Sequence, residues 1–262
     1  MAGELVFDEV TVRYGRPGRP TVTAVDRASF RVRPGEVVGL VGESGCGKST
    51  LAKLACGLVP AAGGRATFDG TPITPYGLRK RPAQLLRLQM VFQNPYASLN
   101  PRRRVAAQLQ DARAIHPATA PSVDDLLRSV GLDPALRTRY PHQFSGGQRQ
   151  RIAIARAMAT GPDLLIGDEP IASLDASLQA QVATLMRDVA LASDTSLLFI
   201  SHDLSVVRLI ADRVVVMQAG RVVEEGPTEQ VWSAPQEAYT QRLLAAIPLA
   251  DGLGTIPDVA PA

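Results

Sequence analysis

Hydrophobic and polar positions follow two patterns along this chain, one typical of strands and one typical of helices. Alternating and β-branched stretches occupy Leu5–Tyr14 and Ala28–Val32, and a turn rich in glycine and proline lies between them, which predicts an antiparallel sheet. Glu36–Gly42 is a continuous apolar run that ends in glycine and is followed by helical spacing, so it predicts a buried strand leading into a helix. Gln89–Gln93 predicts a further strand.

Strand patterns give way to helical ones between about residues 101 and 160. Strands and helices alternate again after this region, with helices expected at Ala176–Leu191 and Leu204–Ile210 and a strand pair around Ala219–Gly220. The order predicts an α/β fold. We expect a mostly parallel core sheet, an antiparallel β subdomain at the N-terminus and an inserted α-helical subdomain at about 101–160.

The last part of the chain predicts a helical extension at about 228–246, in which Pro235 begins a new turn. Residues 247–262 are rich in proline, glycine and alanine, and we expect them to form a flexible tail. A single domain is therefore expected over residues 1–246, since 262 residues suffice for one large α/β core with an inserted lobe.

Composition narrows the function classes only modestly. The chain is 45% hydrophobic and 20% charged, and no apolar run approaches the roughly eighteen residues that a membrane span needs. The net charge of +3 is too small to indicate a nucleic-acid partner. The clusters at Leu78–Pro82 and Pro101–Val105 fit either a solvated face or a partner contact. Only Cys46 and Cys56 occur, without metal or disulfide spacing, and together with an N-terminus unlike a signal peptide they favour a cytoplasmic location.

The sequence "GESGCGKS" at Gly42–Ser49 fits the phosphate-loop pattern, and it lies between a predicted strand and a predicted helix as that motif requires. Its glycines allow backbone N–H groups to surround a phosphate, Lys48 supplies a positive charge, and the Ser49 hydroxyl can bind Mg²⁺. The nucleotide-binding residues expected in this segment are Gly42, Glu43, Ser44, Gly45, Cys46, Gly47, Lys48, Ser49 and Thr50.

Candidate catalytic residues stand at the ends of other predicted strands. "LLIGDEP" ends in Asp168, expected to hold magnesium, and Glu169, expected to orient or deprotonate the water that attacks a γ-phosphate. His202 ends another buried strand and could contact the same phosphate, while Gln93 could reach the metal or the water. Tyr14 could stack on adenine.

A second anion site is predicted where "FSGGQ" opens an arginine-rich helix, because free backbone N–H groups at a helix start attract anions. One nucleotide does not need two such sites in one chain. We therefore expect this segment to contact a nucleotide held by a second molecule, with Ser173–Asp175 at the same seam. The residues expected to make that contact are Ser145, Gly146, Gly147 and Gln148.

These motifs, in this order, resemble the ATP-binding subunits of ABC transporters. "VFQNPYASLNPR" and the tail from Gly220 to Pro248 resemble the dipeptide and oligopeptide importer subfamily, which also includes nickel and other solute importers. The resemblance implies ATP and Mg²⁺ as cofactors, with Ser49, Gln93 and Asp168 as metal ligands and Glu169, His202 and Gln93 in catalysis.

The function implied by this resemblance is hydrolysis of ATP to power import of di- or oligopeptides at the cytoplasmic face of the membrane. The implied partners are transmembrane permease subunits, a second ATPase subunit bound head to tail, which is either related or identical, and indirectly a solute-binding protein. Import of nickel or another small solute remains the alternative, as does a soluble ABC ATPase without a transport role. We would expect such a soluble ATPase to contain two fused ATPase halves or a long coiled-coil insertion, and this chain has neither.

Overall fold

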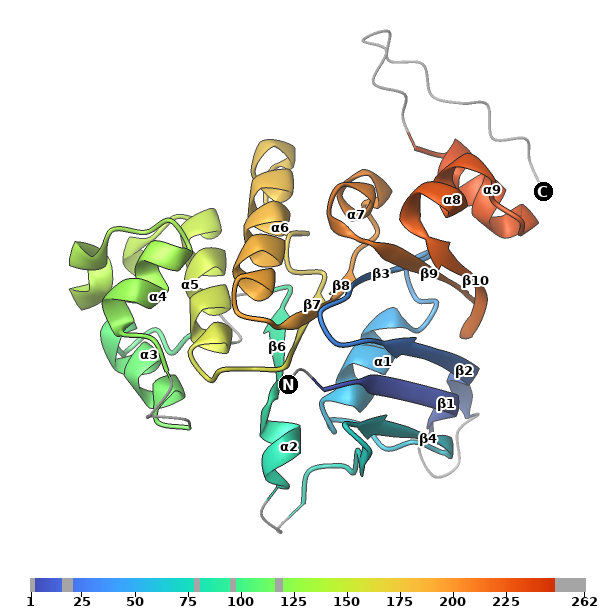
Figure 1. Cartoon of the computed structure of the whole chain (residues 1–262), viewed down its shortest axis with the longest axis horizontal. Coiled ribbons are helices and arrows are strands. Elements are labelled where there is room, and N and C mark those ends of the chain that lie inside the picture. The colour runs from blue at the N-terminus through green and yellow to red at the C-terminus, as the bar shows by residue number, and fades with distance from the viewer. Residues whose placement is uncertain (1–2, 16–20, 78–80, 95–97, 116–119, 248–262) are drawn as a thin grey trace, which may run out of the picture.

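Two sheets stand side by side in the computed structural model, which describes residues 3–15, 21–77, 81–94, 98–115 and 120–247 (Figure 1). The first sheet is antiparallel, with the strand order β2-β1-β4-β5. The second has the order β10-β9-β3-β8-β7-β6, and its strands are parallel except for β10 at the edge. The described strands are β1 (Leu5–Tyr14), β2 (Val22–Val32), β3 (Val37–Val41), β4 (Gly63–Phe68), β5 (Thr71–Pro72), β6 (Leu88–Phe92), β7 (Leu164–Asp168), β8 (Ser196–Ile200), β9 (Arg213–Gln218) and β10 (Arg221–Pro227).

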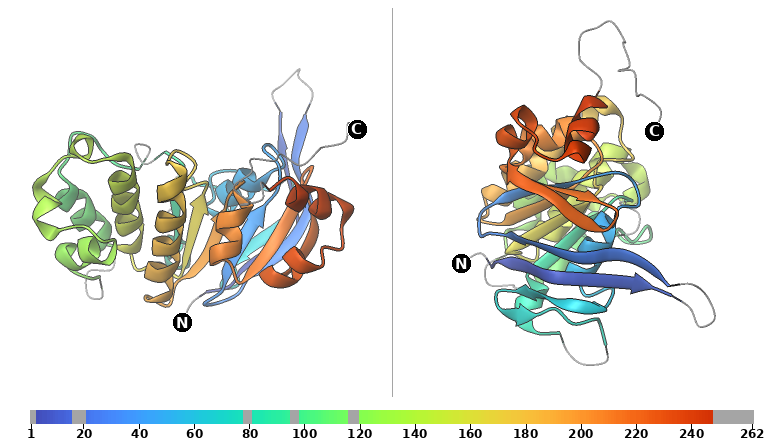
Figure 2. Two further views of the ribbon diagram at one scale, coloured as in Figure 1. Left: turned by 90° about the horizontal axis from the view of Figure 1, so that it is seen from above. Right: turned by 90° about the vertical axis from the view of Figure 1, so that its right-hand side faces the viewer.

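Helices separate into a lobe beside the sheets and a set that packs around the parallel strands (Figures 1 and 2). In the described residues between β6 and β7, the regular elements are all helical. The described helices are α1 (Lys48–Ala55), α2 (Ala83–Leu86), α3 (Val105–Arg113), α4 (Val123–Ser129), α5 (Gly146–Met158), α6 (Ala176–Leu191), α7 (Leu204–Ile210), α8 (Thr228–Ser233) and α9 (Ala238–Ala245), with short 3₁₀ turns η2 (Pro134–Thr138) and η3 (Pro141–Gln143).

Apolar side chains fill two cores, one on each face of the parallel sheet. Along β8, Leu198 and Ile200 face a core shared with α1 and the antiparallel sheet, whereas Leu197 and Phe199 face a core shared with α6, α7 and the helical lobe. Because side chains alternate between the faces of a strand, a strand covered on both faces must be apolar throughout. This requirement explains the uninterrupted apolar runs in the sequence.

Most predicted elements are confirmed. The strand Leu5–Tyr14 and the helices Ala176–Leu191 and Leu204–Ile210 have the predicted bounds. Within the predicted helical region, α4 begins after Ser122, whose hydroxyl accepts a hydrogen bond from the Asp125 amide. The hairpin at Ala219–Gly220 has positive φ at both residues, as two-residue turns of type I′ require.

The sequence predicted a few other elements incompletely or not at all. The strand predicted at Ala28–Val32 begins six residues earlier, at Val22. β4, β5 and α2 carried no prediction. Except for Ile247, the predicted tail 247–262 lies outside the described residues, as does most of the basic cluster Leu78–Pro82.

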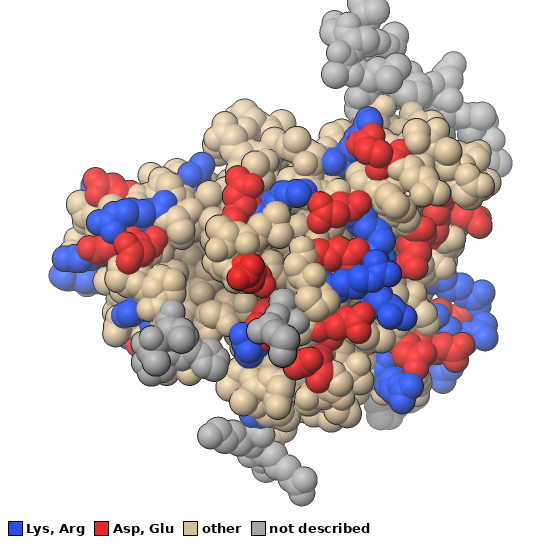
Figure 3. Space-filling model, viewed as in Figure 1, with Lys and Arg blue, Asp and Glu red and all other residues tan. Residues whose placement is uncertain are grey.

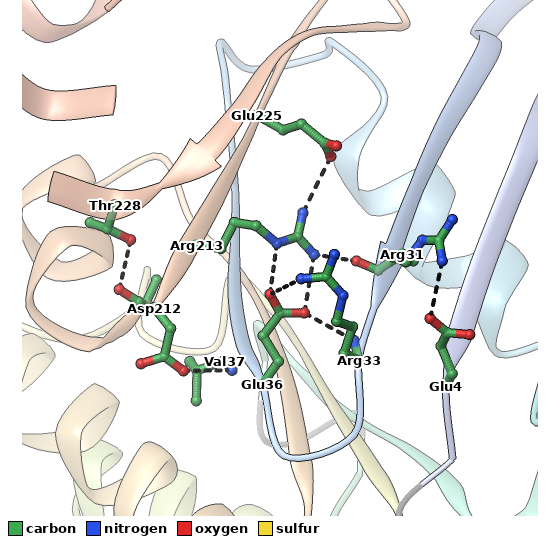
Figure 4. A network of polar contacts seen from close by, with 10 residues as sticks. Glu4, Arg31, Arg33, Glu36, Val37, Asp212, Arg213, Glu225 and Thr228 are labelled. Carbon is green, nitrogen blue, oxygen red and sulfur yellow. Dashed lines mark hydrogen bonds and ion pairs between the residues drawn. The ribbon is translucent and has the colours of Figure 1, made fainter. Parts of the chain in front are cut away.

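An ionic network joins the two sheets (Figure 4). Arg213, at the start of β9, donates to both carboxylate oxygens of Glu36, at 2.7 and 3.1 Å, and also to the Arg31 carbonyl on β2. It pairs as well with Glu225 on β10, at 3.2 Å. Burial by itself would raise the pKa of Glu36, but hydrogen bonds from Arg213 and from the Arg33 amide outweigh it and lower that pKa. The network therefore favours an ionised Glu36 at the junction of the sheets.

Charges on the molecular surface are mixed. In the face that Figure 3 shows, Lys and Arg side chains alternate with Asp and Glu rather than forming a large area of one sign. The net charge of +3 agrees with this distribution. This face provides no broad electrostatic attraction for a polyanion.

Candidate nucleotide-binding site

The phosphate loop connects β3 to α1 and runs close to the backbones of two other strands. Gly42 has a φ of 145°, and a Cβ atom there would lie 2.1 Å from the Met217 carbonyl oxygen of β9. Gly47 has a φ of 110°, and its Cβ atom would lie 2.4 Å from the Ala24 carbonyl oxygen of β2. Only glycine satisfies both the backbone conformation and the close approach at these two positions.

Lys48 places a buried positive charge inside this loop. Lys48 is only 4% exposed. Its Nζ donates to the carbonyl oxygens of Gly42, at 2.7 Å, and Glu43, at 2.9 Å. The ion pairs found among the described residues do not include Lys48. Nζ also contacts Sγ of Cys46 at 3.7 Å. A buried ammonium held by these uncharged groups keeps its charge available to an anionic ligand.

Ser49 and Asp168 meet across the parallel sheet. The Ser49 hydroxyl donates to Oδ1 of Asp168 at 2.6 Å. Asp168 is the last residue of β7 and is buried, which raises the pKa of its carboxyl group, while the hydrogen bond from Ser49 and the charge of Lys53 act in the opposite direction. The carboxyl ends of parallel strands share one edge of a sheet, so β7 delivers Asp168 to the phosphate loop that follows β3.

Glu169 and His202 form a second pair beside the first. Nδ1 of His202 lies 2.8 Å from Oε2 of Glu169. Glu169 has a φ of 49°, an uncommon value for a residue with a side chain, and its backbone N–H donates to the Ile200 carbonyl at the end of β8. The turn directs Glu169 into a cavity of about 180 Å³, which is lined by Ala24, Ser44, Gly45, Gly47, Lys48, Ser49, Thr50 and Glu169.

Gln93 and Tyr14 lie at the ends of their strands, and neither lines this cavity. Phe92 pairs with Asp168 in the parallel register, so Gln93 leaves β6 at the level where Glu169 leaves β7. The carbonyl of Gln93, an exposed residue, accepts a hydrogen bond from the Ser173 hydroxyl at 3.5 Å. Tyr14 ends β1 and is 43% exposed.

The predicted second anion site lies apart from the phosphate loop. Ser145 caps α5, where its hydroxyl accepts from the Gln148 amide and Gln148 Oε1 accepts from the Ser145 amide. α5 belongs to the helical lobe, whereas α1 packs between the two sheets (Figures 1 and 2). A Cβ atom on Gly147 would lie 3.3 Å from Leu178 of α6, so this helix start packs beside the Ser173–Asp175 segment that precedes α6. The structure thus brings the two predicted seam segments together.

Two residues near the site carried no prediction. Ala24 of β2 lines the cavity, and an alanine in a strand has no chemical signal in the sequence. Gln150 of α5 is fully buried, and its Nε2 donates to the Phe92 carbonyl at 3.5 Å, which ties the helical lobe to the strand end before Gln93. Its helical spacing with the buried Ile154 and Ala157 was the available signal.

The sequence that forms this site matches a known protein family. The family model described as "ABC transporter" matches residues 25–172, which is more than half of the chain. The chain belongs to the ABC transporter family. The described part of the chain contains no helix with the length and apolar character needed to cross a membrane.

Two relatives within this family match over two thirds or more of their own length. The chain is 47% identical to the oligopeptide transport ATP-binding protein OppF of Bacillus subtilis (strain 168), covering 89% of this chain and 79% of that protein. It is 45% identical to the probable peptide ABC transporter ATP-binding protein y4tS of Sinorhizobium fredii (strain NBRC 101917 / NGR234), covering 88% and 67%. Among solved structures, cbiO1 of Clostridium perfringens, part of the ABC transporter complex cbiONQ, has a TM-score of 0.72 and 27% identity over 88% of this chain and 90% of that one. As an ABC transporter ATPase, the chain binds ATP and couples its hydrolysis to transport.

Proposed function

We propose that this ATPase powers import of di- or oligopeptides at the cytoplasmic face of the membrane. The proposal rests on sequence similarity. Over nearly nine-tenths of its length, the chain is 45 to 47% identical to subunits named for oligopeptide and peptide transport. A cytoplasmic ATPase need not touch the transported solute, so the peptide assignment rests on those relatives rather than on the site. Nickel or another small solute is the alternative cargo.

The site residues divide into binding and catalytic groups in this proposal. The phosphate loop from Gly42 to Thr50 binds the nucleotide phosphates, with Lys48 neutralising their charge, and Tyr14 stacks on adenine. The hydroxyl of Ser49 and the carboxylate of Asp168 suit Mg²⁺, which prefers oxygen ligands, and Gln93 adds a further oxygen. Bound Mg²⁺ would supply charge stabilisation at the phosphates.

Hydrolysis follows from the pair at the strand ends. Glu169 orients the attacking water and accepts its proton, while the water oxygen bonds to the γ-phosphorus and the bond to the β–γ bridging oxygen breaks, giving ADP and phosphate. The 2.8 Å contact with His202 holds the Glu169 carboxylate in place. His202 also contacts the γ-phosphate, and its exposed ring has room to do so.

A second ATPase subunit completes each site in the proposed assembly. Ser145, Gly146, Gly147 and Gln148 begin a helix of the helical lobe, apart from the chain's own phosphate loop. Because the Ser145 and Gln148 amides bond within the cap, the N–H groups of Gly146 and Gly147, with the Ser145 hydroxyl and the Gln148 side chain beside them, would contact the γ-phosphate bound by a related or identical partner. The transmembrane permease subunits would receive the closure of this pair through the Gln93 segment and the helical lobe. A solute-binding protein would deliver cargo on the other side.

Reconstitution tests this function. The chain is assembled with its co-encoded permease and ATPase subunits in lipid vesicles, and ATP-dependent uptake of labelled di- and tetrapeptides is measured against uptake of Ni²⁺. Peptide uptake that stops in the Glu169→Gln variant supports the proposal. Vesicles that take up Ni²⁺ and no peptide would establish the alternative cargo, and an ATPase without uptake of either would contradict import of both cargoes.

A further inference from the structure

The phosphate loop is joined to the C-terminal helices by one hydrogen bond. The backbone N–H of Glu43 donates to the phenolic oxygen of Tyr239 at 3.0 Å. Tyr239 lies in the first turn of α9 and is 5% exposed, and it packs within the core that also contains Val231 of α8. It lies well beyond residue 172, where the match to the family model ends. The contact therefore links the best-defined motif of the chain to a segment outside that match.

Both polar groups of the Glu43 backbone are held by side chains. Tyr239 accepts from its N–H, and Lys48 Nζ donates to its carbonyl oxygen at 2.9 Å. The three N–H donors of the Lys48 ammonium already contact the carbonyl oxygens of Gly42 and Glu43 and Sγ of Cys46, so binding two phosphate oxygens would require it to release or share at least one carbonyl contact. When nucleotide draws Lys48 toward the phosphates, Tyr239 remains as the side chain that holds Glu43.

α9 is itself anchored just before Tyr239. The carboxylate of Glu224 on β10 accepts from the backbone N–H of Gln236 at 2.8 Å and of Glu237 at 3.1 Å. These two amides directly precede the helix, so Glu224 fixes the point at which α9 begins. Tyr239 therefore lies at a helix start that is tied to β10, the antiparallel edge strand of the second sheet.

We propose that Tyr239 is a positioning residue for the phosphate loop, and that α9 acts through it on nucleotide affinity. The phenolic oxygen fixes the Glu43 peptide, which keeps the loop in its binding shape when Lys48 turns to the phosphates. This inference rests on the proposed phosphate site. It assigns the C-terminal extension a part in ATP binding, although no residue of α9 lines the cavity.

Tyr239→Phe tests the proposal, since it removes one oxygen and keeps the ring in the core. We expect the dissociation constants for ATP and ADP, measured by calorimetry on the full chain, to rise about threefold to tenfold, the range that one ordinary hydrogen bond is worth. The turnover number at saturating ATP should stay within about twofold of wild type, because Tyr239 does not touch the reacting atoms. Tyr76→Phe is the matched control, since Tyr76 is exposed and stacks on Arg81 instead.

Two further measurements separate positioning from general stability. In the nucleotide-free chain, amide hydrogen exchange of the peptide containing Glu43 should be faster in Tyr239→Phe than in wild type, with exchange in the β7 peptide unchanged. Glu224→Ala should weaken ATP binding in the same direction. Combining it with Tyr239→Phe should add little, because both act through one contact.

The outcomes are distinct. Unchanged exchange at Glu43 in Tyr239→Phe would show that the Tyr239 hydroxyl does not hold the Glu43 peptide, whatever the nucleotide affinities are. Faster exchange with wild-type affinities for ATP and ADP overturns the role in nucleotide binding, as does a variant whose only change is a lower melting temperature. A wild-type chain that binds no ATP would instead contradict the proposed function. The exchange experiment would still decide whether Tyr239 holds the Glu43 peptide.

Discussion

The Ser49 hydroxyl donates a hydrogen bond to Oδ1 of Asp168 at 2.6 Å, although 119 residues separate the two in the sequence. The contact joins the start of α1 to the end of β7. Two oxygen groups that suit a hard divalent cation are therefore adjacent before any ligand binds. The predicted metal site can therefore be tested by replacing the Ser49 side chain.

Ser49→Ala should raise the Mg²⁺ concentration needed for half-maximal ATPase activity by about tenfold, because one hydroxyl ligand is lost. Titration of Mg²⁺ at fixed ATP measures this shift. Ser49→Thr keeps the hydroxyl and is the matched control, which should remain close to wild type. Equal Mg²⁺ dependence in wild type and Ser49→Ala would remove Ser49 from the metal site.

Glu169→Gln should lower ATP turnover by about 10² to 10⁴, because the amide cannot accept a proton from the attacking water. ATP binding should survive, since Lys48, Ser49 and Asp168 are unchanged. A subunit pair that closes on ATP should therefore accumulate, visible by size-exclusion chromatography with Mg-ATP and the cognate partner. Near-normal phosphate release would move the catalytic role to another residue, with His202 the next candidate.

Ser145→Arg should block ATP-driven pairing of subunits while leaving ATP binding to the isolated chain nearly intact, because the long side chain would fill the partner's γ-phosphate position. Light scattering with and without Mg-ATP measures the pairing. Ser122→Arg is the control, since Ser122 also caps a helix of the same lobe but lies at α4. If Ser145→Arg paired and hydrolysed ATP normally, the shared-site proposal would be wrong.

Glu36→Gln should reduce the free energy of unfolding at pH 7 by about 1 to 3 kcal/mol, because it removes the charge that Arg213 binds between the sheets. Since the fold lowers the pKa of Glu36 from an ordinary value of 4.5, its ionised form stabilises the fold above about pH 4.5. That contribution is lost as the pH falls through the lower folded pKa. Urea unfolding as a function of pH should show the difference from wild type shrinking in acid.

Glu4→Gln provides the control for that experiment. Glu4 pairs with Arg31 at 3.7 Å, but both side chains are well exposed, so the change should have little effect at any pH. A Glu36→Gln deficit that stayed constant into acid would show that packing, rather than charge, accounts for the loss.

The amino-acid sequence by itself determined much about this protein. The apolar run before Gly42 and the glycine spacing of the phosphate loop predict a strand, a loop and a helix, because these features depend on local backbone conformation and on burial of a whole strand. The order of these strand, helix and motif patterns along the chain also predicts the α/β class and carries the family resemblance. Strand ends also predicted where Asp168 and Glu169 stand, since parallel strands end at one edge.

Tertiary structure decided the contacts that join distant segments. No local pattern pairs Glu43 with Tyr239 or Glu36 with Arg213, because each pair depends on how separate elements pack and on which buried N–H or charge needs a partner. The short strand β4 also escaped prediction, since its sequence, "GGRATF", has two glycines and little alternation, and pairing with β1 supplies the missing order. Local chemistry thus fixes the motifs, whereas long-range packing fixes which of them meet.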